Sequence, residues 1–344
     1  MAARAFITGV AGLALAAEER AFLRDAQPWG IILFKRNVST PIQVQELVSS
    51  FRDALGWQAP VLVDQEGGRV QRLGPPHWAA YPPGARYGQI YDHDKVLGLE
   101  TAQLAGRLIA DDLGARGIDV DCLPIADVPV SGSDPVIGDR AYGTQPDKVS
   151  AIAAAIARGL RLGGVLPVLK HLPGHGRATA DSHHKLPVVD TDQATLEKTD
   201  FAAFRPLRDL PLGMTAHVVF SAIDPDAPAT TSVTMVRQVI RGFIGFQGLL
   251  MSDDISMNAL AGTIAERSRA ALGAGCDVVL HCNGNPKEME QVAGEVPKLE
   301  GEAGKRAERA LAARGAREEF DVEAGRASFN KIIARFADTR KTGS

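Results

Sequence analysis

The sequence has few cysteines, no apolar run long enough to span a membrane and no large excess of charge of one sign. Its net charge is −3 over 344 residues, with acidic and basic residues interspersed, so no basic track for a nucleic acid is expected. The apolar start of the chain is interrupted by Gly9 and Gly12, which argues against an export signal. The odd number of cysteines favours buried thiols over a disulfide framework; they are Cys122, Cys276 and Cys282. We therefore expect a cytoplasmic protein with no membrane or nucleic-acid partner.

Short apolar runs alternate along the chain with segments whose apolar residues recur every three or four positions. The runs predict eight strands: Ala5–Thr8, Gly30–Phe34, Pro60–Val63, Ile118–Cys122, Leu166–Leu169, Gly213–Ala216, Gly248–Met251 and Cys276–Leu280. The intervening segments predict helices: Ser39–Leu55, Leu97–Arg116, Lys148–Leu162, Ala194–Arg208, Ser232–Ile240 and Ala259–Ala274. This repeated order of strand and helix indicates parallel strands joined by crossover connections.

Eight such units predict an α/β fold of the (β/α)₈ TIM-like barrel type, with a doubly wound open sheet as the competing architecture. The barrel is favoured because reactive side chains such as Asp64 and Asp253 follow the predicted strands, and barrel active sites lie at that rim. The segment Lys287–Arg340 is expected to add helices on the outside of the barrel. Residues 1–340 would then form one catalytic domain, and residues 341–344 a disordered tail.

Two adjacent carboxylates, Asp253 and Asp254, stand at the end of the predicted strand in the segment Gly248–Met257. Neighbouring side chains of an extended chain point to opposite faces, so only one of the pair can face a central pocket. The alternative is that these residues cap the helix that follows, since aspartate accepts the free N–H groups of a first turn.

A second candidate segment is VDQEGGRVQR, in which Asp64 leaves a strand and Arg72 follows a turn made by two glycines. A carboxylate that accepts hydroxyl hydrogens and an arginine that donates in a fork can together hold a sugar or an anion. An internal ion pair that stabilises the loop is an equally good interpretation. The same alternatives apply to Arg140 in the segment Ile137–Gly143.

The segment Lys170–Lys185, KHLPGHGRATADSHHK, combines a predicted strand end, a glycine-rich turn and a cluster of histidines. The histidines could ligate a metal, and Lys170 could form a Schiff base. The spacing matches no known metal-ligand pattern. A third alternative is that Asp181 orients His183 for proton transfer.

Three motifs taken together resemble the bacterial β-N-acetylhexosaminidases of glycoside hydrolase family 3. They are KH-x-PGHG-x(4)-DSH at Lys170–His183, SDD-x-SM at Ser252–Met257 and DQEGGRVQR at Asp64–Arg72. The similarity runs from about Ile31 to Asn283, nearly the whole predicted barrel. It implies a retaining exo-β-N-acetylglucosaminidase that removes terminal N-acetylglucosamine from peptidoglycan fragments, the anhydro-muropeptides, during cytosolic cell-wall recycling.

The resemblance also implies a role for each matching residue. Asp253 would be the nucleophile and Asp254 structural, while His183, oriented by Asp181, would be the general acid and base. The residues that match the family's sugar-binding positions are Asp64, Arg72, Arg140, Lys170 and His171. His175 would shape the loop, and the glycines on either side of it, Gly174 and Gly176, would let the following segment swing.

Retaining glycosidases usually employ two carboxyl groups about 5–5.5 Å apart, whereas here a histidine replaces the second. A physical reason is that an imidazole, with an ordinary pKa of about 6.5, exchanges protons at neutral pH without burial. We expect no cofactor, no metal, a small-molecule substrate and a monomeric chain. A Schiff-base aldolase that uses Lys170 and a non-catalytic sugar-binding protein are the two alternative functions.

Overall fold

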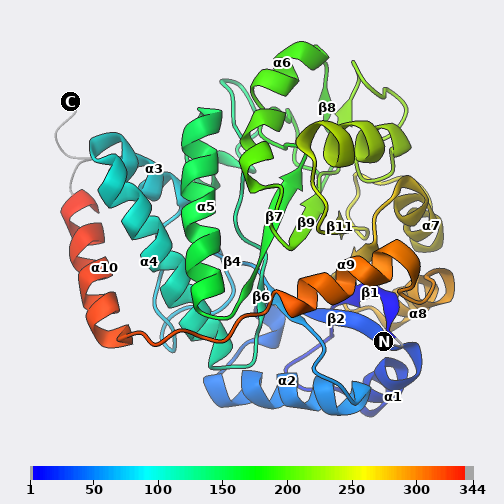
Figure 1. Cartoon of the computed structure of the whole chain (residues 1–344). Helices are drawn as coiled ribbons and strands as arrows, with labels where there is room; N and C mark the ends of the chain where they lie inside the picture. Colours follow the sequence, from blue (N-terminus) through cyan, green and yellow to red (C-terminus); the bar gives the residue numbers. More distant parts are fainter. Residues whose placement is uncertain (1–2, 338–344) are drawn as a thin grey trace.

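The computed structural model describes residues 3–337, in which eight parallel strands close into a barrel (Figure 1). The order around the barrel is β1-β12-β11-β9-β7-β6-β3-β2. These strands are β1 (Arg4–Thr8), β2 (Pro28–Leu33), β3 (Val61–Val63), β6 (Val120–Asp121), β7 (Leu166–Leu172), β9 (Leu212–Thr215), β11 (Leu249–Asp254) and β12 (Val278–His281). Each predicted run overlaps one of them, so the barrel is confirmed and the open sheet was wrong. The predicted tail, 341–344, lies outside the described residues.

Helices surround the barrel and connect its strands (Figure 1). They are α1 (Ala17–Ala26), α2 (Pro41–Leu55), α3 (Gly84–His93), α4 (Lys95–Gly114), α5 (Pro146–Leu162), α6 (Gln193–Lys198), η5 (Met235–Ile244), α7 (Ile264–Ala274), α8 (Pro286–Glu295), α9 (Gly301–Ala312) and α10 (Val322–Ala337). The last three are the helices expected at the end of the chain. Helix α10, red in Figure 1, packs against α4 on the outside of the barrel. Within residues 3–337, no helix is long and apolar enough to cross a membrane.

Two predicted helices differ from the observed structure. The segment Ala194–Arg208 is not one helix, because α6 ends at Lys198 and two short 3₁₀ turns follow, η3 (Phe201–Ala203) and η4 (Arg205–Leu207). Pro206 lies in this segment and lacks the N–H group that a continuous helix would need. The segment predicted at Ser232–Ile240 is the π-helix η5 instead, which ends at Gly245 in the left-handed conformation (φ 81°).

Side chains in the first part of β11 alternate between two buried clusters. Leu249 and Met251 pack in one apolar cluster, and Leu250 packs in the other. The pairing of β11 with β12 shifts register between Met251 and Asp254, which interrupts this alternation. Asp253 and Asp254, which follow the shift, both line the cavity at the end of the strand.

Two small sheets extend the rim of the barrel. The antiparallel hairpin of β4 (Gln65–Gly67) and β5 (Val70–Gln71) follows β3 directly. Gly67 turns this hairpin with φ 97°, in the region that favours glycine. The parallel pair of β8 (Val188–Val189) and β10 (Val219–Phe220) lies beyond β7 and β9 in the chain. The hairpin is important for function because it carries the residues between Asp64 and Arg72.

Candidate active site

A cavity of about 280 Å³ lies at the carboxyl ends of the barrel strands. It is lined by all eight residues that the sequence predicts for the site, namely Asp64, Arg72, Arg140, Lys170, His171, Asp181, His183 and Asp253. Two of the larger hollows lie on the outside of the barrel against α5 and the 315–320 segment, and neither contains any of these residues. The predicted residues therefore form one site, although they come from separate parts of the chain.

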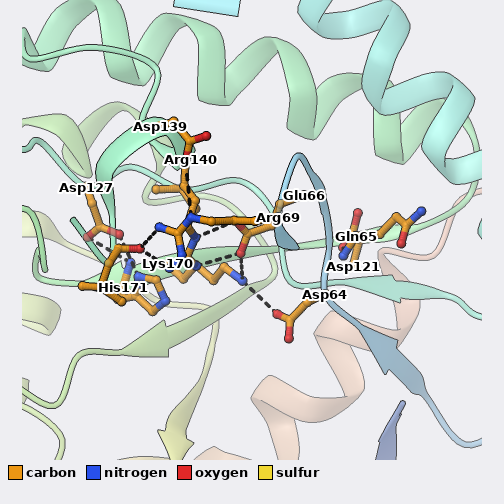
Figure 2. Close-up of polar contacts among 12 residues, drawn as sticks. Asp64, Gln65, Glu66, Arg69, Asp121, Asp127, Asp139, Arg140, Lys170 and His171 are labelled. Atoms are coloured by element: carbon orange, nitrogen blue, oxygen red, sulfur yellow. Dashed lines mark hydrogen bonds and ion pairs between the residues drawn. The ribbon is translucent and has the colours of Figure 1, made fainter. Parts of the chain in front are cut away.

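A network of buried ion pairs forms one wall of this cavity (Figure 2). The Nζ atom of Lys170 lies 2.9 Å from Oδ1 of Asp64 and 2.7 Å from Oε1 of Glu66. Arg140 donates two hydrogen bonds of 2.8 Å to Glu66, and Arg72 donates one of 2.9 Å to Asp64. Three cations and two carboxylates therefore hold one another in fixed orientations.

Ion pairing within this network keeps its side chains charged. Burial alone would raise the pKa of Asp64, but Lys170 and Arg72 outweigh it and hold the pKa well below its usual range. The same balance, with Arg140 and Lys170 as the opposing cations, lowers the pKa of Glu66 to about 2. Burial would lower the pKa of Lys170, yet the two carboxylates raise it above its ordinary value. Lys170 is therefore a charged ammonium group at neutral pH.

Lys170 and His171 lie within β7, whose pairing continues to Leu172 rather than ending at Leu169 as the apolar run predicts. His171 is held by Asp127, a fully buried residue in the loop after β6, whose Oδ2 lies 2.7 Å from Nδ1 of His171. Burial would raise the pKa of Asp127, but His171 and His175 lower it below its ordinary value. An ionised carboxylate only accepts hydrogen bonds, so Nδ1 of His171 carries the proton.

The two adjacent carboxylates at the end of β11 have different surroundings. The carboxylate of Asp254 accepts from the backbone N–H of Ser256 at 2.9 Å, from its hydroxyl at 2.7 Å and from the N–H of Cys282 at 3.1 Å. Among residues 3–337, the Oδ1 atom of Asp253 accepts only the N–H of Asp254, at 2.8 Å. The geometry thus makes Asp254 a brace between β11 and the end of β12, and leaves Asp253 available to a ligand.

The electrostatic surroundings keep Asp253 ionised. Burial would raise the pKa of its carboxyl, but the nearby His217 and His171 and the backbone N–H of Asp254 lower it below its ordinary value. His217 is itself fixed, with Nδ1 2.7 Å from the hydroxyl of Thr230 and Nε2 3.0 Å from the carbonyl oxygen of Asp254. Asp253 is therefore a partly buried, anionic nucleophile candidate.

Asp181 and His183 meet at the mouth of the cavity. The Nδ1 atom of His183 lies 2.7 Å from Oδ1 of Asp181, and the imidazole side chain is 61 % exposed. Burial acts to raise the pKa of Asp181, but its hydrogen bonds to His183 lower it. The carboxylate fixes the imidazole through Nδ1 and leaves Nε2 for another partner.

The glycines on either side of His175 are closely packed. Gly174 has φ 146°, which side chains rarely adopt, and a Cβ atom on Gly176 would lie 2.1 Å from the carbonyl oxygen of Val128. Both glycines are therefore required by backbone conformation and close approach. Their proposed role as a hinge stays a prediction.

Several residues of the site were not among those predicted from the sequence. Glu66 has a local signal, because it follows a predicted strand together with Asp64. His217 has the same signal, because it directly follows the predicted strand Gly213–Ala216. Asp127 is aligned by its contact with the distant His171, and Ser182 by its contact with His175, seven positions before it. Across residues 3–337, no group of three or more His, Cys, Asp or Glu side chains has an arrangement that could hold a metal ion.

Comparisons with known proteins identify the family of this chain. The family described as "Glycosyl hydrolase family 3 N terminal domain" matches residues 6–313. A β-hexosaminidase of Bordetella avium is 38 % identical over 278 residues, which cover 80 % of this chain and 79 % of the relative. One from Alkalilimnicola ehrlichii is 39 % identical over 293 residues, covering 84 % and 83 % of the two chains.

A solved structure extends the similarity to the whole fold. NagZ from Neisseria gonorrhoeae, crystallised with N-trifluoroacetyl-D-glucosamine, aligns with a TM-score of 0.85 at 32 % identity, over 98 % of each chain. The sequence relatives thus cover at least 80 % of the chain, and the solved structure covers 98 % of it. The chain belongs to glycosyl hydrolase family 3, among its bacterial β-hexosaminidases.

Proposed function

We propose that this glycoside hydrolase is a retaining exo-β-N-acetylglucosaminidase that releases terminal N-acetylglucosamine from peptidoglycan fragments in the cytoplasm. The observation that carries the proposal is the single cavity in which an anionic Asp253, the Asp181–His183 pair and the ion-pair network lie together. Family membership supplies the reaction class, because its curated relatives are β-hexosaminidases.

The ion-pair network is suited to bind a terminal sugar. Asp64 offers carboxylate oxygens to hydroxyl groups, while Arg72 and Lys170 offer donors whose directions are fixed by their partners. The relative from Neisseria gonorrhoeae binds N-trifluoroacetyl-D-glucosamine, which supports an N-acetylglucosamine unit as the ligand here. A buried wall that contacts the non-reducing end leaves no path for further sugars, which makes the enzyme exo-acting.

The first half of the reaction breaks the glycosidic bond. The carboxylate of Asp253 attacks the anomeric carbon and forms a glycosyl ester, while the bond to the leaving oxygen breaks through an oxocarbenium-like transition state. His183, in its protonated form, donates its proton to that oxygen. Asp181 stabilises the positive charge of the imidazole and directs the ring.

The second half releases the sugar. The neutral His183 removes a proton from a water molecule, whose oxygen attacks the anomeric carbon and displaces Asp253. Two inversions at one carbon give net retention of configuration. The proton that His183 gave away in the first half is thereby restored.

The charge on Lys170 argues against the Schiff-base alternative. A Schiff-base lysine must be neutral to attack a carbonyl carbon. Here two carboxylates within 2.9 Å of Nζ hold the amine in its protonated form. Borohydride reduction with a keto substrate should therefore leave no added mass on Lys170.

The decisive experiment is incubation with N-acetylglucosaminyl-anhydro-N-acetylmuramic acid, with and without phosphate. Proton NMR should first detect free β-N-acetylglucosamine, at a rate independent of phosphate, and Asp253→Asn should release none. Initial formation of the α-anomer would overturn retention, and a sugar phosphate would overturn hydrolysis. Binding of N-acetylglucosamine without turnover would instead favour the non-catalytic sugar-binding protein.

A further inference from the structure

Ser182 lies between Asp181 and His183 and lines the same cavity, but it is buried while their side chains are partly exposed. Ser182 is only 3 % exposed, whereas the side chains of Asp181 and His183 are 30 % and 61 % exposed. Its hydroxyl oxygen lies 3.1 Å from Nε2 of His175. Ser182 therefore attaches the segment that carries Asp181 and His183 to His175.

His175, the residue that receives Ser182, is held firmly. Its backbone N–H donates to Oδ1 of Asp127 at 2.6 Å, and its ring packs edge-on against that of His171 with 5.8 Å between centroids. The ring is 3 % exposed, and Gly176 packs closely against Val128 directly after it. His175 is therefore held firmly enough to orient the Ser182 side chain that contacts it.

Asp127 connects this seat to the sugar site. One of its oxygens accepts the N–H of His175, and the other lies 2.7 Å from Nδ1 of His171. Asp127 therefore holds both His175, the partner of Ser182, and His171, which lines the cavity. A short chain of contacts thus joins the cavity wall to the exposed catalytic segment.

The polar contacts of the His175 ring are few. Its Nδ1 atom is buried and, among the residues that the structure describes, has no hydrogen-bond partner. The hydroxyl of Ser182 is therefore the side-chain partner on which the ring's other nitrogen depends. Loss of that hydroxyl would remove the polar attachment of the segment and leave the ion-pair network of the cavity wall in place.

We propose that Ser182 is a positioning residue for proton transfer, whose hydroxyl, seated on His175, holds the Asp181–His183 pair at the leaving oxygen above Asp253. The inference rests on the proposed role of His183 as general acid. It predicts that Ser182 affects protonation of the leaving group more than binding of the sugar.

The test is Ser182→Ala with a series of aryl N-acetylglucosaminides. For poor leaving groups, kcat/KM should fall about three- to tenfold, the effect of one hydrogen bond. For 2,4-dinitrophenyl glycosides it should change little, because such leaving groups need no proton. A plot of log kcat/KM against leaving-group pKa should therefore become steeper, which a general structural defect would not produce.

Matched variants keep the test specific. Ser221→Ala removes a hydroxyl that bonds the carbonyl oxygen of Val189 at 3.3 Å, outside the cavity lining, and should leave the slope unchanged. In a His175→Ala background, Ser182→Ala should cause no further loss, because the partner is already absent. An equal loss for all leaving groups, or full additivity of the two changes, would overturn the proposal.

His183→Ala in the same series separates this proposal from the proposed function. If His183→Ala steepens the slope and Ser182→Ala does not, only the role of Ser182 is wrong. If His183→Ala leaves the slope unchanged, the general-acid assignment on which both rest is wrong.

Discussion

Lys170 and Glu66 meet at 2.7 Å in the wall of the cavity, although one lies on β7 and the other on the hairpin after β3. Both side chains are almost completely buried, and Glu66 is bound on its other side by Arg140. Breaking a buried pair leaves a charge without compensation. The contact therefore links the stability of the barrel to the shape of the sugar site.

Glu66→Gln should weaken both folding and substrate binding. One carboxylate would then face three cations, so the free energy of unfolding should fall by about 3–5 kcal/mol. Urea titration measures this loss, and KM should rise because Lys170 and Arg140 lose their common anchor. Glu302→Gln, which alters an exposed pair with Lys305, is the control and should change neither quantity. Unchanged KM in Glu66→Gln would contradict the role of Glu66.

Asp253→Asn and Asp254→Asn should separate catalysis from structure. The first should lower kcat by a factor on the order of 10⁴–10⁶, as removal of a nucleophile does, and leave the unfolding transition unchanged. The second should lower stability instead, because Asp254 braces Ser256 and Cys282. Kinetics and thermal unfolding of both variants check the distinction. Near-normal activity of Asp253→Asn would rule out its assignment as the nucleophile.

His183→Glu should move the pH–rate profile towards acid. An exposed glutamic acid has an ordinary pKa of about 4.3, so it would carry no proton to donate at neutral pH. The side chain at this position is 61 % exposed, which leaves little burial to raise that pKa. Initial rates from pH 4 to pH 8 measure the effect. A profile identical to that of the parent enzyme would show that the choice of histidine has another reason.

His175 should make stability depend on pH between 6.5 and 4. Burial lowers the pKa of His175 to about 4 from its ordinary 6.5, so only the unfolded chain takes up this proton within that window. His175 therefore makes its full contribution to the free energy of unfolding above pH 6.5. This contribution is lost as the pH falls to 4, a change of roughly 3 kcal/mol. Urea titrations at pH 7 and pH 4.5 should show the loss in the parent enzyme.

His175→Gln is the matched variant for this measurement. The amide does not titrate, so stability in that window should vary less with pH than in the parent. Asp64 and Glu66, whose pKa values are also lowered, lose their contributions only as the pH falls below their ordinary range. An equal pH dependence in both proteins would assign the effect to other groups.

The sequence by itself determined the barrel and eight of the residues that line the cavity. Apolar periodicity acts within a few residues of the chain, which is why each predicted strand overlaps an observed one. Parallel strands closed into a barrel bring their carboxyl ends to one rim, so reactive residues after Val63, Leu169 and Met251 had to meet there. Helix continuity was predicted less well, because the prediction of one helix over Ala194–Arg208 ran across Pro206 and the apolar spacing of Ser232–Ile240 does not distinguish an α-helix from the π-helix η5.

Only the tertiary structure decided which of these residues pair. The contact between Asp64 and Lys170 spans 106 positions, and that between Asp127 and His171 spans 44. No local pattern encodes such distances, because a partner is selected by where the closed barrel places it and by the cost of burying a charge alone. The contact between Ser182 and His175 could likewise not be predicted from the motif that contains both residues. It depends on how the folded loop is placed on the barrel.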